Sequence, residues 1–275
     1  MKAITYERDW TELQSDMANA KTRSGWDSLS SASESDPVWA GSRTWGDAVH
    51  MLTYGWAEGR SKLAQAAEYS APMMQRTRRP RYRYSPAGGT PHVPNVCIGV
   101  PNVMRSRGGQ AGNAQAPVVR IAVNIGASCF IDPQDIINRG GALIALIDSI
   151  EAGGQRVELE ACTRSRCDNN ETDLRVRIMI KRATDALSLD RIAFALASPS
   201  MLRRVEFRIL EITLPKQEFG YGTPGDFDED DFPANTMYLP RMEKRIYETE
   251  ERAVRHVQRK WDEAKTEWQQ EGELV

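Results

Sequence analysis

The sequence predicts an α/β protein, a sheet flanked by helices, with Arg/Gly-rich loops and a long C-terminal helix added to it. Three observations lead to this prediction. Residues 118–215 alternate between strand-like and helix-like patterns, which is typical of a sheet covered by helices. Residues 72–117 are dense in Pro and Gly, which prevents long helices and favours extended loops or mobile arms. Residues 240–271 are charged with apolar side chains along one side, as in an amphipathic helix.

These patterns divide the chain into four segments. We predict a helical Trp-rich segment at 1–71, an Arg/Gly/Pro-rich arm at 72–117, an α/β core at 118–215, and an acidic loop followed by the amphipathic helix at 216–275.

The N-terminal segment holds five of the seven tryptophans of the chain. A helix is predicted from Thr44, because threonine is a good N-cap and Asp47 places an acid in the first turn. A second helix is predicted over residues 60–69. The tryptophans are expected in the core or in an interface. They are Trp10, Trp26, Trp39, Trp45 and Trp56.

In the core segment the apolar pattern changes repeatedly between strand and helix. Asp132 followed by Pro133 predicts a helix start, with an acid as N-cap and proline at the first helical position. Gly153 is expected to end this helix, and a second helix is predicted over residues 187–197. Strands are predicted over residues 118–125, 156–162 and 174–180, and over the second half of residues 201–214.

The first strand and helix of the core, beginning VVRIAVNIGASCFID, resemble a von Willebrand factor A-like domain. In that family a strand-end Asp-x-Ser-x-Ser motif holds a divalent cation. The matching positions here read Asn124-Ile125-Gly126-Ala127-Ser128. The carboxylate and one hydroxyl that a hard cation needs are therefore missing. The resemblance implies a degenerate metal site, and no metal is expected.

The sequence lacks the motifs of common enzyme classes. It has neither a Gly-x-x-x-x-Gly-Lys-Ser/Thr phosphate loop nor a His-Glu-x-x-His zinc helix. The three histidines are isolated, and the four cysteines are too scattered for a zinc site or a disulfide framework. We therefore expect no catalytic residues and no cofactor. Carboxylates such as Asp132, Asp135 and Asp148 leave acid–base catalysis open, because partners can meet in space.

Neither a membrane partner nor secretion is expected. No stretch approaches the roughly 18 apolar residues that span a bilayer. The charges of the N-terminus are not followed by the apolar run of a signal peptide.

Charge is distributed unevenly along the chain, although the net charge is only −2. Residues 69–131 carry eight arginines and no acid, whereas residues 205–275 carry seventeen acids against ten bases. Arginine is permanently charged, and its planar donor fork fits phosphate oxygens. The arginine-rich block therefore predicts binding to a polyanion.

Tyrosines alternate with arginines in the run Arg81-Tyr82-Arg83-Tyr84. In an extended strand this places the tyrosines on one side and the arginines on the other. Single-stranded nucleic acid fits such a strand, because its bases stack on aromatic faces while guanidinium groups follow the backbone. The predicted site comprises Arg76, Arg78, Arg79, Arg81 and Arg83 for phosphates, Tyr82 and Tyr84 for bases, and Arg105 and Arg107 to extend the path.

Two alternatives stay open for the charged segments. The arginine block can cover an acidic face of the same protein or of a neighbouring subunit, because the run from Asp226 to Phe232 is acidic. In that case the chain is a non-catalytic structural or assembly protein whose basic arm and acidic tail hold subunits together. The acidic run can also be a solvated loop or a docking site for a basic partner.

Size, composition and segment order resemble a group of podoviral single-stranded-DNA-binding cofactors of phage RNA polymerase, which lack an OB fold. The similar residues are Gly55-Trp56-Ala57-Glu58-Gly59 before the core and Ala197 to Arg204 (ASPSMLRR) within it. The resemblance implies a transcription cofactor in the host cytoplasm that binds melted promoter DNA and recruits the phage polymerase. The expected partners are single-stranded DNA, phage RNA polymerase and further copies of the chain in a homo-oligomer.

Overall fold

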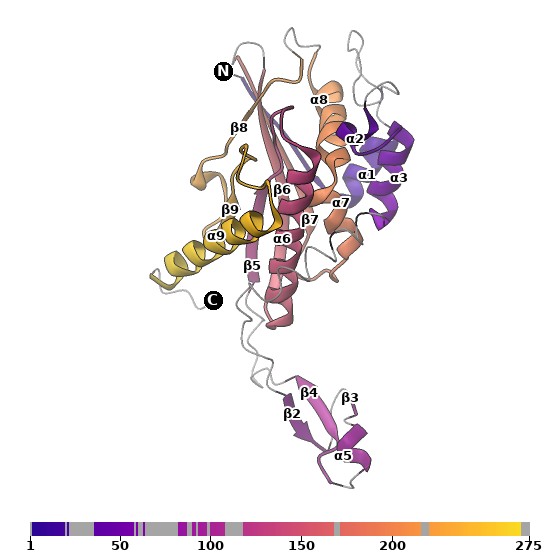
Figure 1. Cartoon of the computed structure of the whole chain (residues 1–275), viewed down its shortest axis with the longest axis vertical. Helices are drawn as coiled ribbons and strands as arrows, with labels where there is room; N and C mark the ends of the chain where they lie inside the picture. Colours follow the sequence, from indigo (N-terminus) through magenta and orange to yellow (C-terminus); the bar gives the residue numbers. More distant parts are fainter. Residues whose placement is uncertain are drawn as a thin grey trace.

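The structure is a computed structural model that describes residues 2–19, 21, 36–57, 59, 63, 82–86, 90–91, 93–97, 100–107, 118–167, 171–215 and 220–270. It contains a six-stranded sheet, which forms the body, and a three-stranded sheet that stands apart from it in Figure 1. The predicted class, an α/β sheet flanked by helices with a long C-terminal helix, is confirmed. Within these ranges no helix has both the length and the apolar character needed to cross a membrane.

The six-stranded sheet is mixed, with the order β1-β7-β6-β5-β9, and β8 pairs with the end of β6. Strands β5, β6 and β9 are parallel, while β7 is antiparallel to β6 and parallel to β1. The carboxyl ends of the three parallel strands therefore meet at one edge of the sheet. The bounds are β1 Lys2–Asp9, β5 Val118–Asn124, β6 Arg156–Cys167, β7 Thr172–Lys181, β8 Thr223–Gly225 and β9 Thr236–Leu239.

The predicted strand–helix–strand unit is β5, α6 and β6. Helix α6 spans Pro133–Ala152, and the carboxylate of its N-cap Asp132 accepts a hydrogen bond from the Gln134 amide at 2.8 Å. Gly140 lets α6 approach α7 (Leu189–Ala197), because a Cβ at this position would lie 2.2 Å from the Cβ of Ala197. The helix start and the close packing of α6 on α7 thus follow from single residues.

The N-terminal segment differs from the predicted helical segment at its beginning. Residues 2–9 form β1, an edge strand of the core sheet that pairs with β7. Ile4 and Tyr6 alternate with exposed residues and pack against the core, which explains the strand. Helices α1 (Trp10–Asn19), α2 (Pro37–Ala40) and α3 (Trp45–Tyr54) follow, and Thr44 and Asp47 form the predicted cap of α3. Apart from residue 63, the helix predicted over residues 60–69 lies outside the described residues.

The strand predicted in the second half of residues 201–214 is wrong, because this stretch is helical. A π-helical segment, η1 (Met201–Glu206), continues into α8 (Phe207–Thr213). Met201, Val205 and Ile209 follow one another at four-residue spacing and are at most 1% exposed. Packing of this helical side on the core overrides the β propensity of the branched residues.

The C-terminal helix is confirmed but begins later than predicted. Helix α9 spans Glu250–Gln270, and the Thr249 hydroxyl caps it by accepting a hydrogen bond from the Arg252 amide at 3.2 Å. Residues 240–249 are irregular, with Arg245 in a left-handed conformation (φ 76°). The predicted apolar side contacts α6 and β9. Its buried members are Ala253, Val257, Trp261, Ala264 and Trp268.

Candidate nucleic-acid interface

The candidate interface is the three-stranded sheet of the arm, whose order is β2-β4-β3. Strand β2 spans Tyr82–Ser85, β3 spans Thr90–Pro91 and β4 spans Met104–Arg107, with the short helix α5 (Val93–Cys97) between β3 and β4 along the chain. The sequence predicted extended loops or mobile arms for this segment. The described residues instead form short strands, because Pro and Gly confine strands to edges and short runs without excluding them.

The register of the antiparallel pair β2–β4 joins the two arginine-bearing stretches of the arm. Tyr82 is the partner of Arg107, and Tyr84 is the partner of Arg105. Residues directly opposite each other in an antiparallel pair belong to the same face of the sheet. These four positions therefore share one face by register, and Arg83, which lies between the two tyrosines, belongs to the other.

The structure places five of the nine predicted site residues. Tyr82, Arg83 and Tyr84 are in β2, and Arg105 and Arg107 are in β4. The remaining four lie outside the described residues. They are Arg76, Arg78, Arg79 and Arg81.

An asparagine closes the connection between β3 and β4. The Asn95 side chain donates a hydrogen bond to the Asn102 carbonyl oxygen at 2.9 Å, and the Asn95 carbonyl oxygen accepts one from the Val100 amide at 3.3 Å. No acid occurs in the sequence of the arm, residues 72–117. The positive charge of the arm therefore has no neutralising group within its own segment.

The acidic run from Asp226 to Asp231 is bound to the body of the protein. Three of its carboxylates contact arginines of the body, which come from β6, from β7 and from the stretch after β9. The pairs are Asp226–Arg241 at 3.2 Å, Asp228–Arg164 at 3.8 Å and Asp231–Arg175 at 2.7 Å. Much of the negative charge that was a candidate partner for the arm is thus already used within the body.

At the carboxyl end of β5, Asn124 occupies the position that corresponds to the cation motif of the resemblance. It is 0% exposed. Its Nδ2 donates hydrogen bonds to the Gly225 carbonyl oxygen at 2.9 Å and to the Tyr238 hydroxyl at 3.1 Å, and its Oδ1 accepts one from the Gly126 amide at 3.0 Å. An amide can donate in this way and a carboxylate cannot, so Asn124 ties β5 to Gly225 of β8 and to Tyr238 of β9. Among the described residues, no three His, Cys, Asp or Glu side chains gather as metal ligands would.

Several arginines of the body are buried and bind backbone carbonyl groups or tryptophan rings. Arg203 is 1% exposed and donates to the Trp39 carbonyl oxygen at 2.6 Å, and burial lowers its pKa to about 10. The same guanidinium lies 4.5 Å from the centre of the Trp39 ring, and that of Arg208 lies 4.7 Å from the ring of Trp45. These tryptophans therefore pack within the body, as predicted.

Comparison with known proteins identifies the family of the chain. Residues 2–262 match the model of a family described as a domain of unknown function, DUF7192. The chain belongs to the DUF7192 family. The matched range includes the arm, the core sheet and the first half of α9. No curated protein and no solved structure matches the chain.

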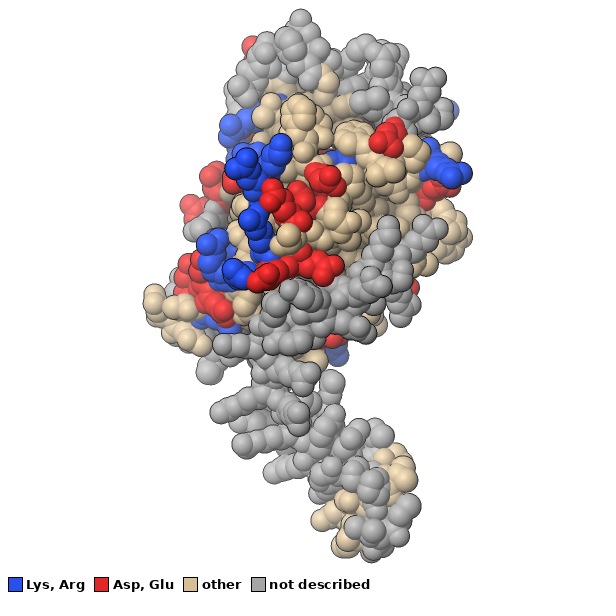
Figure 2. Space-filling model, viewed as in Figure 1, with Lys and Arg blue, Asp and Glu red and all other residues tan. Residues whose placement is uncertain are grey.

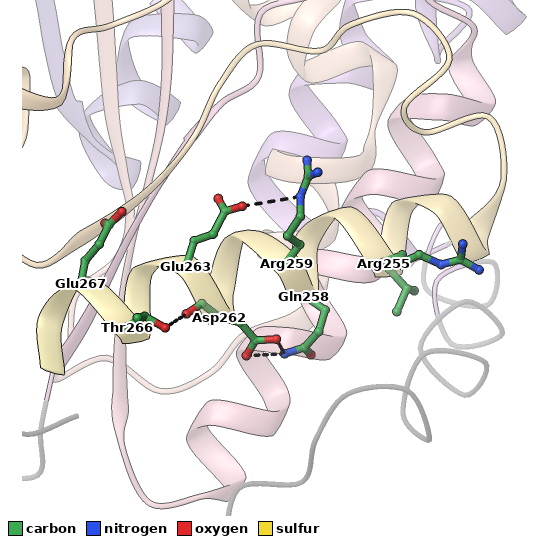
Figure 3. A pocket seen from close by; sticks show the side chains of 8 residues that line it. Arg255, Gln258, Arg259, Asp262, Glu263, Thr266 and Glu267 are labelled. Carbon is green, nitrogen blue, oxygen red and sulfur yellow. Dashed lines mark hydrogen bonds and ion pairs between the residues drawn. The ribbon is translucent and has the colours of Figure 1, made fainter. Parts of the chain in front are cut away.

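On the body of this DUF7192 protein, basic and acidic side chains lie next to one another over the face shown in Figure 2. Along the outer side of α9, Arg259 pairs with Glu263, and Gln258 binds Asp262 (Figure 3). A surface whose positive charges are already paired attracts a polyanion only weakly. The outer side of α9 is therefore a poorer candidate than the arm for binding nucleic acid.

Sequence reasoning missed the pairing of β2 with β4 in this DUF7192 protein. Residues 86–103 separate the two strands, and no two-residue turn marks a hairpin. The alternation of Tyr and Arg before residue 85 was a signal for a strand. Its partner strand carries no comparable signal, so the register had to come from the structure.

Proposed function

We propose that the protein binds single-stranded DNA through its arm, without catalytic activity, and acts as a phage transcription cofactor that recruits RNA polymerase to melted DNA. One observation carries the DNA-binding part. In a segment without acids, the register pairs Tyr82 with Arg107 and Tyr84 with Arg105. Residue types that bind bases and residue types that bind phosphates are thereby brought to one face.

The spacing of these positions suits a single strand. Directly opposite residues in an antiparallel pair are about 4.5–5.5 Å apart, so a base on a tyrosine and its phosphate on the opposite arginine belong to one nucleotide-sized unit. A duplex hides the faces of its bases in the stack. A two-stranded ribbon can, however, enter the major groove of a duplex, so duplex DNA belongs in the test.

The ion pairs of the body favour this proposal over an intramolecular role for the arm. Asp226, Asp228 and Asp231 contact arginines of the body, and each carboxylate already satisfied in this way is a weaker partner for a second guanidinium. Nucleic acid supplies the missing negative charge at high density.

The central test is a fluorescence titration with oligo-dT at several salt concentrations, alongside a duplex of equal length and oligo-U. For single strands, log affinity is expected to fall by about 0.7 per log unit of salt for each phosphate neutralised. A flat salt response, or unchanged affinity in Arg83→Ala/Arg105→Ala/Arg107→Ala, contradicts the proposal. If the protein binds the duplex more tightly than oligo-dT, the arm contacts a groove of the duplex and does not bind by stacking on unpaired bases.

Base stacking is tested separately at the two tyrosines. Tyr82→Ala/Tyr84→Ala is expected to cost about 1–3 kcal/mol of binding free energy for each base that no longer stacks. Tyr82→Phe/Tyr84→Phe keeps the aromatic faces and should keep the affinity. Equal losses in the two double variants would point to the hydroxyl groups instead.

The polymerase part of the proposal rests on the resemblance stated above. In the similar stretch from Ala197 to Arg204, Ala197, Ser198, Ser200, Arg203 and Arg204 are at most 2% exposed, so these residues support the body of the protein. Recruitment is tested by capture of phage polymerase on the tagged chain, with and without oligo-dT. Capture that fails under both conditions rejects this part and leaves DNA binding untouched.

A second candidate function, assembly with other copies of the chain, is favoured by an apolar surface near the carboxyl end of β5. Phe130 and Val38 are 81% and 73% exposed. Their segments are joined by a hydrogen bond from Trp39 Nε1 to the Cys129 carbonyl oxygen at 3.2 Å. Light scattering at rising salt separates the functions. Subunits held by the arm and the acidic tail dissociate as salt rises, whereas subunits held by this apolar surface stay associated, and neither kind of assembly shows affinity for oligo-dT.

A further inference from the structure

A cleft of about 690 Å³ lies between the loop that carries the acidic run and the second half of α9. Its floor is aromatic, because Phe232 and Trp268, which are 9% and 5% exposed, contribute to its lining. The Tyr238 ring stacks on that of Phe232 with 4.9 Å between the ring centres. Clefts of this size accommodate ligands or several side chains of a peptide.

Acids outnumber bases around this cleft. Its charged lining residues are Asp226, Asp230, Lys260, Glu263 and Glu267. Asp226 is held by Arg241 at 3.2 Å, and Glu263 is held by Lys260 at 2.8 Å. The carboxylates of Asp230, on the loop, and of Glu267, on the helix, have neither an ion pair nor a hydrogen bond with any residue that the structure describes. In Figure 3, Glu267 stands apart from the paired Arg259 and Glu263.

One ring of this floor already contacts a cation of the protein, from outside the cleft lining. The guanidinium of Arg177, on β7, lies 5.1 Å from the centre of the Phe232 ring. Aromatic faces attract arginine and lysine through the charge distribution of the ring. The cleft thus combines two unneutralised carboxylates, one on each wall, with rings of a kind that bind cations.

We propose that this cleft binds an arginine- or lysine-rich segment of a protein partner. The segment places one cationic side chain against each of Asp230 and Glu267 and lays its stem on the aromatic floor. The same charge repels nucleic acid, so the cleft is a second site, separate from the arm. This inference goes beyond the proposed function and does not depend on it.

The test uses the full chain and a fluorescein-labelled nona-arginine peptide, followed by fluorescence anisotropy. The wild type is expected to bind the peptide and to ignore a nona-glutamate peptide. Asp230→Asn/Glu267→Gln should lose about tenfold in affinity, because opposite charges across an interface are removed without loss of volume. The indole N–H signal of Trp268 in NMR spectra should shift when the wild type binds the peptide.

A matched control removes the same charge elsewhere. Asp148 and Glu243 are exposed acids outside the cleft, so Asp148→Asn/Glu243→Gln should change the affinity by less than about twofold, as long-range charge effects are screened by salt. Equal losses in the two double variants, or no binding to the wild type, overturn the proposal.

The two sites are separated by testing each variant with both probes. Asp230→Asn/Glu267→Gln should keep its affinity for oligo-dT, and Arg83→Ala/Arg105→Ala/Arg107→Ala should keep its affinity for nona-arginine. If the arm variant binds nona-arginine more tightly than the wild type, the natural occupant is the arm itself. That result overturns the proposal that the occupant is a protein partner. If the wild type binds nona-arginine but not oligo-dT, only the proposed function is rejected, and the cleft proposal stands.

Discussion

Arginines of the body and arginines of the arm differ in what surrounds them. In the body, Arg139 is 2% exposed and donates hydrogen bonds to the Asn124 and Pro240 carbonyl oxygens, both at 2.8 Å. Arg164 binds the buried Asp173 at 2.8 Å. In the arm, by contrast, Arg83 and its neighbours belong to a segment without a single acid.

The number of arginines in a segment therefore does not indicate its function, whereas the hydrogen-bond acceptors around those arginines do. A buried guanidinium must have its donors satisfied, and removing either partner is costly. A guanidinium without acceptors nearby stays hydrated and available to an external anion. The same residue type is therefore expected to stabilise the body and to bind ligand in the arm.

The largest expected effect is in the body, at Arg139. Arg139→Ala leaves the Asn124 and Pro240 carbonyl oxygens without their donor and opens a cavity, which should lower the free energy of unfolding by about 3–5 kcal/mol. Urea denaturation measures this change. Arg120, which is paired with Glu158 at 3.4 Å and has a side chain that is 40% exposed, is the control on the neighbouring β5. Arg120→Ala should cost about 0–1 kcal/mol. Similar losses in both variants would remove the distinction between buried and exposed arginines.

The next effect concerns a buried acid, Glu206. Burial raises the pKa of this carboxyl from 4.5 to about 7. In the unfolded chain the Glu206 carboxyl ionises at lower pH than in the folded protein. Its contribution to the free energy of unfolding is therefore fully present below pH 4.5 and is lost as pH rises towards 7. The fall amounts to about 3 kcal/mol at roughly 1.4 kcal/mol for each pKa unit.

Glu206→Gln tests this dependence because it removes the ionisation and keeps the shape. Urea denaturation between pH 4.5 and 8 should show a flatter profile for the variant than for the wild type. Asp148→Asn, at an exposed position on α6, should keep the wild-type slope. A Glu206→Gln profile as steep as the wild type would assign the pH dependence to other groups.

In the arm, the effect is expected on binding and not on folding. Arg83→Ala/Arg105→Ala/Arg107→Ala should weaken oligo-dT binding by about 2 kcal/mol, at roughly 1 kcal/mol for the phosphate contact of each of Arg105 and Arg107, which share the face of the tyrosines. The salt dependence should fall by about 1.4 log units per log unit of salt, at about 0.7 for each of the two arginines on the face of the tyrosines. Stability measured by urea denaturation of the body should stay within about 0.5 kcal/mol of the wild type, as for surface substitutions. A large loss of stability would mean that these arginines have partners in the body.

The core of the fold was predictable because its signals are local. Asp132 and Pro133 mark the start of α6, and the alternation in β7 marks a strand. Sequence patterns failed where tertiary packing decides the secondary structure. The branched residues of α8 suggested a strand, and β1 was hidden in a segment dominated by tryptophans and helices.

The candidate site was predictable in composition but not in geometry. The arginines and tyrosines of the arm stand out in the sequence because their segment lacks acids. The pairing of Tyr82 with Arg107 joins positions far apart along the chain, and no turn between them sets the register. The ion pairs of the acidic run depend likewise on the place where the loop meets β6 and β7.

The smallest effect is expected on the outer side of α9, where Arg255 pairs with Glu251 one turn away. Both side chains are at least half exposed, at 75% and 50%. Glu251→Gln should therefore cost about 0.3–0.5 kcal/mol, as exposed pairs at this spacing do. Thermal denaturation at low and high salt measures it, and the difference should vanish at high salt because water and ions screen the pair. A loss as large as that of Arg139→Ala that disappears at high salt would mean that pairing, and not burial, makes the arginines of the body essential.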